Sequence, residues 1–247
     1  MRTLLFHPLA SIVMLLLIWQ GTSWLAASPL LPPPETVGSV LVREIASGSL
    51  PYHLGITLAR LAVSFVLAMA LGTALGIVLG RHPKLDRFFD PWVVLFLNIP
   101  ALVSIILCYV WFGLVESAAV AAVVINKLPN VVVTVREGTR TLDRDLLEMA
   151  EVYRFGPLKT LRHVIWPQLS PFILAAARTG LSLIWKIILV VELLGRSNGM
   201  GYQLHLFFQM FDVASILAYT IAFVVVVQLI ELAILQPLDR HARRWRR

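Results

Sequence analysis

Among the ionisable side chains inside long apolar stretches of this chain, five are candidates for a functional role, namely Arg60, Lys127, Arg178, Lys186 and Glu192. Because a charge inside a membrane is energetically costly, such groups usually belong to a pathway for ions or polar solutes. Four cations against one carboxylate would suit an anionic solute. On an ideal helix Arg178 and Glu192 lie within about 40° of each other, whereas Lys186 and Glu192 are about 120° apart. One face of the apolar stretch 171–195, which contains these three residues, is therefore expected to line a pathway or to face another subunit.

Two of these cations also have a simpler explanation. Arg60 could lie near the outer membrane interface and extend its guanidinium to water. Lys127, with Asn126 as a polar neighbour, could pair with a backbone carbonyl beside Pro129. The residues alone leave both explanations open.

The charged groups belong to a chain that is too apolar for an aqueous fold. Of its 247 residues, 58% are hydrophobic and 14% are charged, and the mean hydropathy is +0.81. Soluble domains carry roughly 25% charged residues, so the apolar excess must face lipid or other membrane helices. The net charge of +7 does not indicate a nucleic-acid partner, because most basic residues flank the apolar runs. The single cysteine, Cys108, excludes an intrachain disulfide.

The apolar runs predict an all-α, polytopic membrane protein of about six spans. Each run is near the roughly 20 residues that a spanning helix needs. The expected spans are residues 9–27, 55–80, 92–114, 117–135, 171–195 and 214–236. The first could be a cleaved signal peptide, since Arg2 precedes a run that ends at Ser28. That run is longer than a usual signal core, which favours a retained helix.

The expected topology follows from the basic residues between spans, which accumulate on the cytoplasmic side of membranes. An inside N-terminus places fifteen Lys and Arg residues inside and only Arg43 and Arg196 outside. We therefore expect both termini to be cytoplasmic and the location to be a bacterial inner membrane. The Arg-rich tail, residues 240–247, would then lie at the acidic inner leaflet.

Glycine and proline positions refine this outline. Gly72, Gly76 and Gly80 recur every four residues, which lets two helix backbones approach closely, either within the chain or between two copies. Pro100 and Pro129 predict kinks in the third and fourth spans. Segment 28–53, rich in proline and glycine, predicts an irregular outer loop with one short helix.

The longest cytoplasmic stretch, about residues 136–170, predicts an amphipathic helix. Thr141 or Asp143 could cap its start. Between Arg136 and Arg162 it holds six basic and five acidic residues, a balance that favours a protein groove over anionic lipid. A helix that merely lies on the membrane surface is the alternative. The expected apolar face comprises Leu142, Leu146, Met149, Ala150 and Tyr153, and the expected charged face comprises Arg144, Asp145, Glu148 and Glu151.

This stretch carries a family resemblance. Glu148-Met149-Ala150, followed by Val164-Ile165-Trp166-Pro167, resembles the EAA loop of binding-protein-dependent ABC importer permeases. That pattern reads Glu-Ala-Ala, three residues, Gly, nine residues and Ile-x-Leu-Pro, and the spacing is kept. Arg154 occupies the glycine position, with Gly156 two residues later. This departure puts the shape of the turn between the two short helices in question.

The resemblance extends over most of the chain. The segment from Thr57 to Gly80 is similar to the second span of nitrate-, sulfonate- and taurine-type permeases, and so is Asn98-Ile99-Pro100 leading to Trp111-Phe112-Gly113. Asn198-Gly199-Met200-Gly201 is similar as well. The resemblance implies one type I ABC importer permease domain, residues 1–247, with a core of about 54–236 and a coupling loop of about 141–167.

The resemblance also implies two sets of site residues. The ATPase-coupling set comprises Arg144, Leu147, Glu148, Met149, Ala150, Glu151, Tyr153, Arg154, Phe155, Gly156 and Pro167. Together with the polar residues found inside the spans, the positions typical of the family give a translocation pathway of Asn126, Arg178, Trp185, Lys186 and Glu192.

The expected partners follow from what the chain lacks. No G-x-x-x-x-G-K-[ST] phosphate loop occurs, so we expect a transport subunit that is not an enzyme and binds no cofactor, with ATP and Mg²⁺ on a partner ATPase. The resemblance adds an extracytoplasmic solute-binding protein and a second permease copy, giving a homodimer. The expected solute is a small anion such as a sulfonate, taurine, nitrate or bicarbonate. An ion-coupled secondary transporter, which would need repeated halves, and a membrane anchor without transport are the alternatives.

Overall fold

The computed structural model describes residues 3–235 and residue 237, and all regular structure in this part of the chain is helical. Arg2 and the Arg-rich tail lie outside the described residues. The elements are α1 (Thr3–Ala26), α2 (Pro34–Ala46), α3 (Ser49–Arg81), α4 (Pro83–Asn98), α5 (Ala101–Phe112), α6 (Glu116–Arg140), α7 (Arg144–Val152), α8 (Pro157–Thr160), the π-helix η1 (Leu161–Ile165), α9 (Trp166–Gly195), α10 (Met200–Gln209), α11 (Val213–Ile230) and the π-helix η2 (Glu231–Leu235).

Four helical segments are long and apolar enough to cross a membrane: α3, α6, the continuous segment Pro157–Gly195 and the segment Val213–Ala233. The pair α4 and α5 meets the same test when the two helices are taken together. Within α1 the apolar run is shorter, Ala10–Ala26. The expected polytopic all-α architecture is confirmed, but the described residues give four spanning segments, or five with the pair α4 and α5, instead of six, because the apolar run of the expected first span is too short. The expected third span is built from two helices instead of one.

The third span departs from the prediction at Pro100. Instead of one kinked helix over residues 92–114, α4 begins at Pro83, ends at Asn98, and is followed by α5 at an angle of 98°. Ile99 has an extended backbone (φ −70°, ψ 123°), as expected for a residue that precedes a proline. The break leaves backbone carbonyls in the last turn of α4 without helical partners. In this turn Asn98 Nδ2 donates to the Val94 carbonyl over 2.7 Å. Pro129, by contrast, lies inside a continuous α6.

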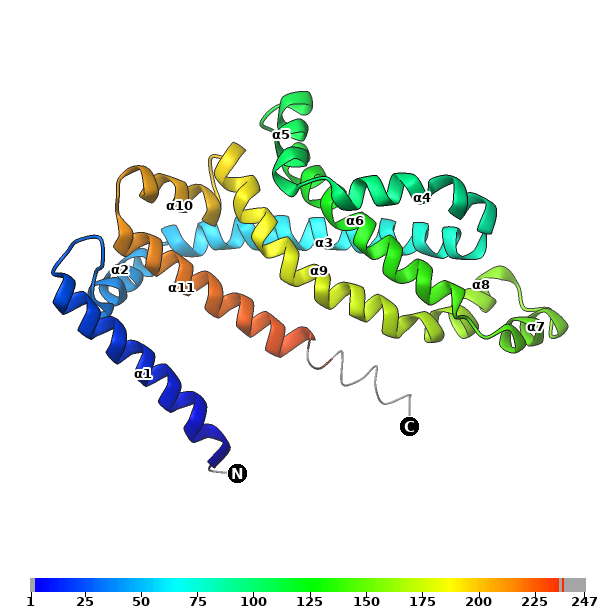
Figure 1. Ribbon diagram of the computed structural model, residues 1–247, viewed down its shortest axis with the longest axis horizontal. Helices are drawn as coiled ribbons and strands as arrows, with labels where there is room; N and C mark the ends of the chain where they lie inside the picture. Colours follow the sequence, from blue (N-terminus) through cyan, green and yellow to red (C-terminus); the bar gives the residue numbers. More distant parts are fainter. Residues whose placement is uncertain (1–2, 236, 238–247) are drawn as a thin grey trace.

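Helix α6 occupies the centre of the bundle and packs against both α3 and α9 (Figure 1). The main core lies between these helices and α5, α10 and α11. From α9 it takes Ile184, Ile188 and Val191, and from α5 it takes Cys108, which is buried. Most of the remaining apolar surface of the long helices points outward, as a membrane environment requires.

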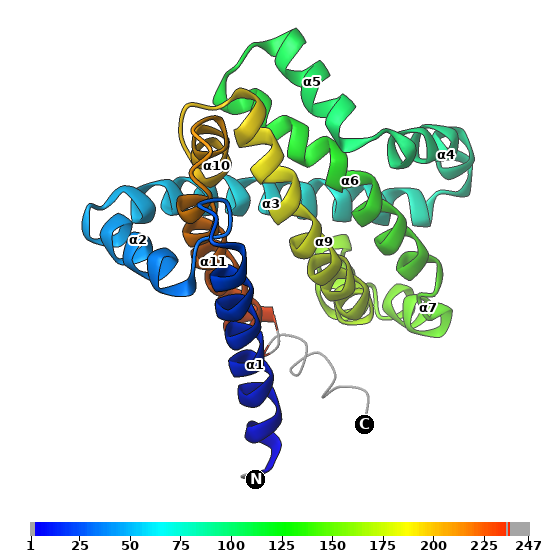
Figure 2. The ribbon, with the colours of Figure 1, turned by 60° about the vertical axis from the view of Figure 1, so that its left-hand side comes forward.

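Segment 28–53 is more ordered than predicted. It contains α2, which starts with Pro34 in its first turn and packs against α11 through Val37 and Val40. Helix α1 projects from the body of the molecule beside α2 (Figure 2). Its end is fastened to the following loop by Trp19 Nε1, which donates to the Pro32 carbonyl over 3.0 Å.

The glycine strip brings α3 onto α6 within the chain. A Cβ atom at Gly72 would lie 2.6 Å from Val131 Cβ, and a Cβ at Gly76 would lie 2.8 Å from Val135 Cβ. Gly80 faces Thr139 in the same way. Of the two explanations for this strip, packing inside the protomer is therefore the one that the structure supports, because each glycine is already covered.

We predict that Gly76→Ala lowers the free energy of unfolding by about 1–3 kcal/mol, the usual cost of overpacking a tight interface. The added methyl would meet Val135 and, at 3.0 Å, the Val132 carbonyl. Gly55→Ala on the same helix is the matched control, since no atom lies within 4 Å of its Cβ position. Thermal unfolding in detergent measures both variants. Equal melting temperatures for the two would contradict the proposed contact.

Candidate functional site

The loop between α6 and α9 begins with a capped helix. Asp143 Oδ1 accepts hydrogen bonds from the Asp145 and Leu146 backbone amides, over 2.9 and 3.4 Å, and so caps α7. This selects Asp143 over Thr141 as the predicted cap. The Asp143 amide donates to Gln168 Oε1 over 2.9 Å, which ties the start of the loop to the first turns of α9.

The apolar face of α7 differs from the predicted one. Leu142 and Leu147 pack against the cluster that contains Val131, Val135 and Ile165, and Ala150 is buried. Tyr153, predicted on the buried face, is 71% exposed. Leu146 and Met149 are also exposed. The prediction is confirmed for Leu142 and Ala150 and wrong for Leu146, Met149 and Tyr153, because helical spacing alone cannot tell which side of so short a helix is covered.

Arg154 adopts the left-handed conformation that the family pattern assigns to glycine. Its φ is 54°. The Phe155 amide donates to the Ala150 carbonyl over 2.8 Å and the Arg154 amide donates to the Glu151 carbonyl over 2.9 Å. These two bonds form a Schellman motif, the usual glycine-terminated helix end. The turn thus keeps its usual shape although arginine replaces glycine. Gly156 has φ −68° and does not require glycine.

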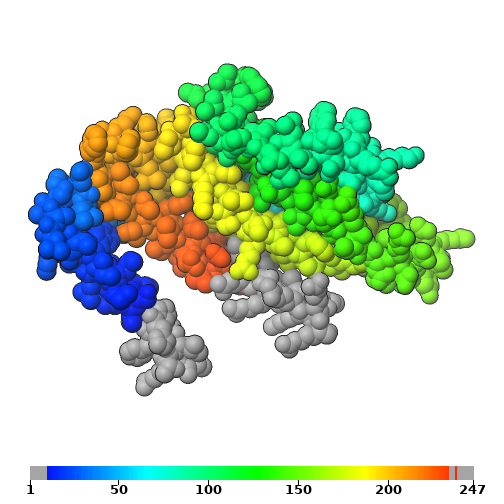
Figure 3. Space-filling view, in the orientation of Figure 1, coloured from blue at the N-terminus to red at the C-terminus, as the bar shows by residue number. Residues whose placement is uncertain are grey.

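The second half of the loop is the beginning of the fifth span. Helices α8, η1 and α9 form one continuous segment from Pro157 to Gly195. Val164 and Ile165 are buried against the bundle, whereas Trp166 and Pro167 are exposed. Together α7 and α8 lie at one end of the molecule, far from α1 and α10 (Figure 1). The space-filling view shows this end projecting beyond the neighbouring helices (Figure 3).

Most of the predicted coupling residues gather on the surface of this end. Leu147 and Phe155 are half-buried and Ala150 is buried, so these three support the loop from within. The remaining members are exposed: Arg144, Glu148, Met149, Glu151, Tyr153, Arg154, Gly156 and Pro167. The structure thus brings the set together, and its role in coupling stays a prediction.

An ionic cluster fastens the end of α6 from which the loop departs. Arg136 Nη1 donates to Asp86 Oδ1 over 3.0 Å and to Asp90 Oδ1 over 2.6 Å. Arg140 also pairs with Asp86, and its Nη1 donates to Glu137 Oε1 over 2.8 Å. The two aspartates are four residues apart on α4, and the two arginines are four residues apart on α6. This matching spacing is a signal in the sequence that hydropathy and loop charge do not reveal.

A second ionic cluster lies at the opposite end, around Arg60. This side chain is 5% exposed, so the expectation that it reaches water at the interface was wrong. Its Nη1 donates to Glu192 Oε1 over 2.7 Å, and its Nη2 donates to Glu116 Oε2 over 3.0 Å. It also holds the outer connection between α9 and α10, since Nη1 donates to the Asn198 carbonyl over 2.9 Å.

Glu192 joins this cluster to the start of α10. The Gly201 amide donates to Glu192 Oε2 over 2.9 Å, and Thr57 Oγ1 donates to the same carboxylate over 2.9 Å. A carboxylate at a helix N-terminus is favoured by the helix dipole. A Cβ atom at Gly199 would collide with this carboxylate, and Gly199 has φ 104°. The Asn198–Gly201 segment therefore has glycines because the backbone must pass directly over Glu192.

The five predicted pathway residues do not share one surface. Glu192 is fully buried in the cluster just described, whereas Arg178 and Lys186 are exposed on α9. Trp185 is 6% exposed and packs edge-on against Phe223. Asn126 Nδ2 donates to Ser104 Oγ over 2.7 Å and so links α6 to α5. Their role in transport stays a prediction, and Glu192 has a structural role in addition.

Lys127 is buried in the middle of the bundle, and its side chain packs against α9 at Gly180. A Cβ atom at Gly180 would lie 2.6 Å from Lys127 Cε. Within the described part of the chain no carboxylate lies at ion-pair distance from it, and no hydrogen bond to the expected carbonyl beside Pro129 is found. Gly180 is therefore required for the packing of α9 on α6, since any side chain there would displace the lysine.

Comparison with known proteins now identifies this architecture. The model of the family described as binding-protein-dependent transport system inner membrane component matches residues 72–247. The chain belongs to this permease family. Among its relatives, SsuC of Bacillus subtilis (strain 168), a permease named for aliphatic sulfonates transport, is 30% identical over 231 residues, covering 93% of this chain and 83% of SsuC. The taurine transport system permease TauC of Escherichia coli (strain K12) is 25% identical, covering 96% and 88%.

Solved structures show the same fold. A chain of the MetNI methionine ABC transporter in an inward-facing conformation superimposes with a TM-score of 0.68 at 19% identity, covering 81% of this chain and 98% of that chain. The protein is therefore an ABC importer permease of the type I fold. This membership sets aside both alternatives, the ion-coupled secondary transporter and the anchor without transport.

The permease turn at Arg154 can be tested directly. We predict that Arg154→Gly stabilises the loop by about 1 kcal/mol, because a left-handed arginine costs about 1–2 kcal/mol that glycine avoids. Arg154→Val should destabilise it. Hydrogen exchange of the Arg154 and Phe155 amides measures the effect, with Gly156→Ala as a neutral control, since its φ is −68° and its Cβ position is open. Faster exchange in Arg154→Gly would contradict the assignment of this turn.

The buried cluster supplies a second test. We predict that Glu192→Gln lowers the free energy of unfolding by about 3–5 kcal/mol, because it leaves the buried Arg60 charge without its interior partner. Glu116→Gln is the matched control: its side chain is 52% exposed, so water can replace the lost contact and the effect should be clearly smaller. A denaturant titration of the purified permease measures both. Equal losses would show that Arg60 does not depend on Glu192.

Proposed function

We propose that the loop at residues 141–167 docks an ATPase subunit that binds ATP and Mg²⁺, while this chain binds neither. The observation that carries this proposal is an apolar tip that nothing in the described chain covers. Val152, Tyr153 and Leu158 are 78%, 71% and 77% exposed, and they lie at the end of α7 and in α8. Exposed apolar side chains surrounded by charged groups are typical of protein interfaces.

The charges around this tip suit a protein partner. Glu148, Glu151, Arg144 and Arg154 are all exposed close to it, so both signs of charge are present. A surface of this kind can be recognised by a complementary groove, whereas a membrane surface would favour basic residues alone. The Schellman turn fixes the position of Tyr153 relative to α8, so the tip is presented in one shape.

We further propose that two copies of the chain form the pathway and that an extracytoplasmic binding protein delivers the solute to the opposite end. The support for this orientation is charge. In the sequence, basic residues concentrate in the segments at the loop end, and between spans only Arg43 and Arg196 lie at the other end. Both termini would then be cytoplasmic, in a bacterial inner membrane.

The proposed solute is a small anion such as a sulfonate, taurine, nitrate or bicarbonate. The relatives SsuC and TauC are named for aliphatic sulfonates and for taurine, which share the sulfonate group. In this chain Arg178 and Lys186 are exposed on α9. Arg178 also lines a cavity of about 250 Å³ with Thr179, Leu181, Ser182, Trp185 and the acidic Glu231. Cationic and hydroxyl groups of this kind can bind an anionic oxygen.

In the proposed cycle, ATP binding brings two ATPase subunits together and moves the two docked loops with them. The helices that continue from the loops then open the pathway outward, and hydrolysis resets it. The permease supplies a helix bundle with two arrangements, and the nucleotide state of the partner selects between them.

The docking proposal predicts that Tyr153→Ala weakens binding of the ATPase about tenfold or more, the usual effect of truncating a central interface aromatic. Uptake of a labelled alkanesulfonate should fall in parallel. Tyr52→Ala is the matched control for copurification of the ATPase, because Tyr52 is 58% exposed at the opposite end of the molecule. The measurements are copurification of the ATPase and uptake into reconstituted vesicles. Undiminished copurification with Tyr153→Ala would contradict the docking surface.

A further inference from the structure

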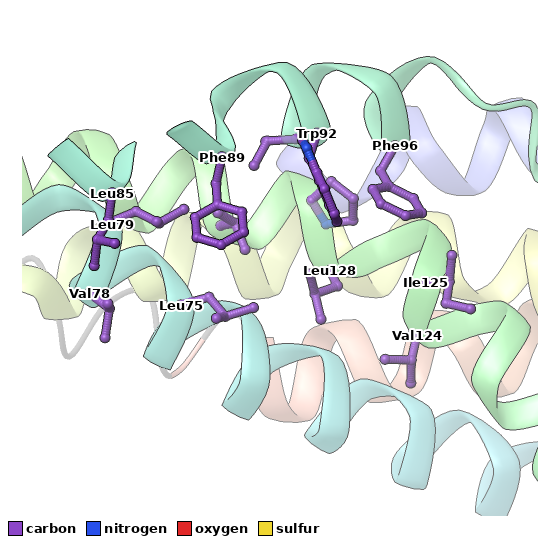
Figure 4. Close-up of a pocket in the computed structure, with 13 residues that line it drawn as sticks. Leu75, Val78, Leu79, Leu85, Phe89, Trp92, Phe96, Val124, Ile125 and Leu128 are labelled. Carbon is purple, nitrogen blue, oxygen red and sulfur yellow. The ribbon is translucent and has the colours of Figure 1, made fainter. Parts of the chain in front are cut away.

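An apolar groove runs between α3, α4 and α6, on the side of the bundle to which α4 adds (Figure 4). From α4, Phe89, Trp92 and Phe96 point into it, and they face Leu75 of α3 and Leu128 of α6. Every side chain that lines it is apolar except for the indole nitrogen of Trp92. The groove has a volume of about 370 Å³.

The groove is too narrow to enclose a helix of another protein, which with its side chains is about 10–12 Å wide. At most one face of such a helix could enter it. A flexible hydrocarbon chain, which is far thinner, fits the space. The groove lies between helices of a membrane protein, where lipid acyl chains are the apolar molecules at hand.

The charges at one end of the groove are basic and exposed. Its lining begins with Val78, Leu79 and Leu85, which flank the turn between α3 and α4. That turn carries two exposed cations: Arg81 and Lys84. In the part of the chain that the structure describes, neither forms an ion pair.

The acidic residues of the same segment do not neutralise these cations. Asp86 and Asp90 are both engaged by Arg136 of α6, and Asp86 also by Arg140. Arg87 is a third exposed cation on α4. The free charge at this end of the groove is therefore positive, which complements an anionic headgroup.

We propose that the groove binds one anionic phospholipid, with an acyl chain between α3, α4 and α6 and the phosphodiester held by Arg81 and Lys84. Basic side chains that flank an apolar groove at the membrane surface are the arrangement expected for such a lipid. This site is separate from the docking surface at Tyr153 and from the cavity at Arg178.

The bound lipid would support the coupling end of the permease. It holds α4, and α4 supplies the two aspartates that fasten Arg136 and Arg140 at the end of α6. The loop departs directly after Arg140. Anionic lipid therefore stabilises the contact between α4 and the end of α6 from which the docking loop departs.

Native mass spectrometry of the full chain in detergent tests this site. We expect one phosphatidylglycerol to be retained at least about tenfold more strongly than phosphatidylcholine with the same acyl chains, given about 1 kcal/mol for each basic side chain. The double variant Arg81→Gln with Lys84→Gln should lose this preference. Lys159→Gln with Arg162→Gln, which removes the same charge elsewhere on the same end of the molecule, should keep it.

Three results would overturn the proposal. The first is equal retention of the two lipids by the unaltered chain, or a preference that survives Arg81→Gln with Lys84→Gln. The second is undiminished retention of phosphatidylglycerol by Leu75→Trp, which fills the groove at a residue that is 45% exposed and can accept the larger side chain. Size-exclusion chromatography confirms that each variant is folded.

The third result concerns a second copy of the chain. Cysteines introduced through Val78→Cys and Trp92→Cys, in a Cys108→Ser background, lie on the two sides of the groove. Disulfide-linked dimers formed through them in membranes would show that two copies meet at the groove, which would leave no room for the lipid.

Discussion

A guanidinium that is almost fully buried must be met by carboxylates, and much of this permease is arranged around that requirement. Arg60 lies inside the bundle and is satisfied by Glu192, Glu116 and the Asn198 backbone. These partners come from α9, from the start of α6 and from the connection to α10. One buried cation thereby fixes three segments that are distant in the sequence. At the other end Arg136 does the same for α4 and α6 through Asp86 and Asp90. Between the two ionic clusters the helices are held mainly by close packing, with a hydrogen bond from Asn126 to Ser104 that links α6 to α5.

The general architecture could be predicted from the sequence because hydropathy and charge act locally. Apolar runs and their basic flanks are visible without any knowledge of the fold, and so are the loop at residues 141–167 and the glycine strip. The partners of the glycines were not visible, because Val131, Val135 and Thr139 look like ordinary residues of a span. The ionic clusters were hidden for the same reason. Asp86 sits among basic residues that suggest a solvated turn, yet its side chain is buried against α6.

In the loop at residues 141–167, the presence of a short helix could be predicted, but its orientation and the shape of the turn that follows it could not. Helical spacing correctly indicated a short amphipathic helix, but which of its sides is covered depends on the angle at which α7 leaves α6. The substitution of arginine for glycine at position 154 left the shape of the turn open, because the sequence alone does not reveal a positive φ. Here the hydrogen bonds of the Schellman motif outweigh the local strain, and the tertiary contacts of Leu147 and Ala150 hold the preceding helix in place.

The close approach of α3 and α6 makes these two helices move together as one rigid unit. Because three successive glycines bring the backbones together, one helix cannot slide along the other without a clash of the opposing Cβ atoms. Helix α3 has 33 residues and is therefore about 50 Å long. A tilt of about 10° imposed at the end of the bundle where the loop lies would move the far end of α3 by roughly 9 Å. A small rotation at the loop end would thus reach the opposite end of the bundle as a larger displacement, carried by the rigidity of the helix pair in place of a chain of local rearrangements.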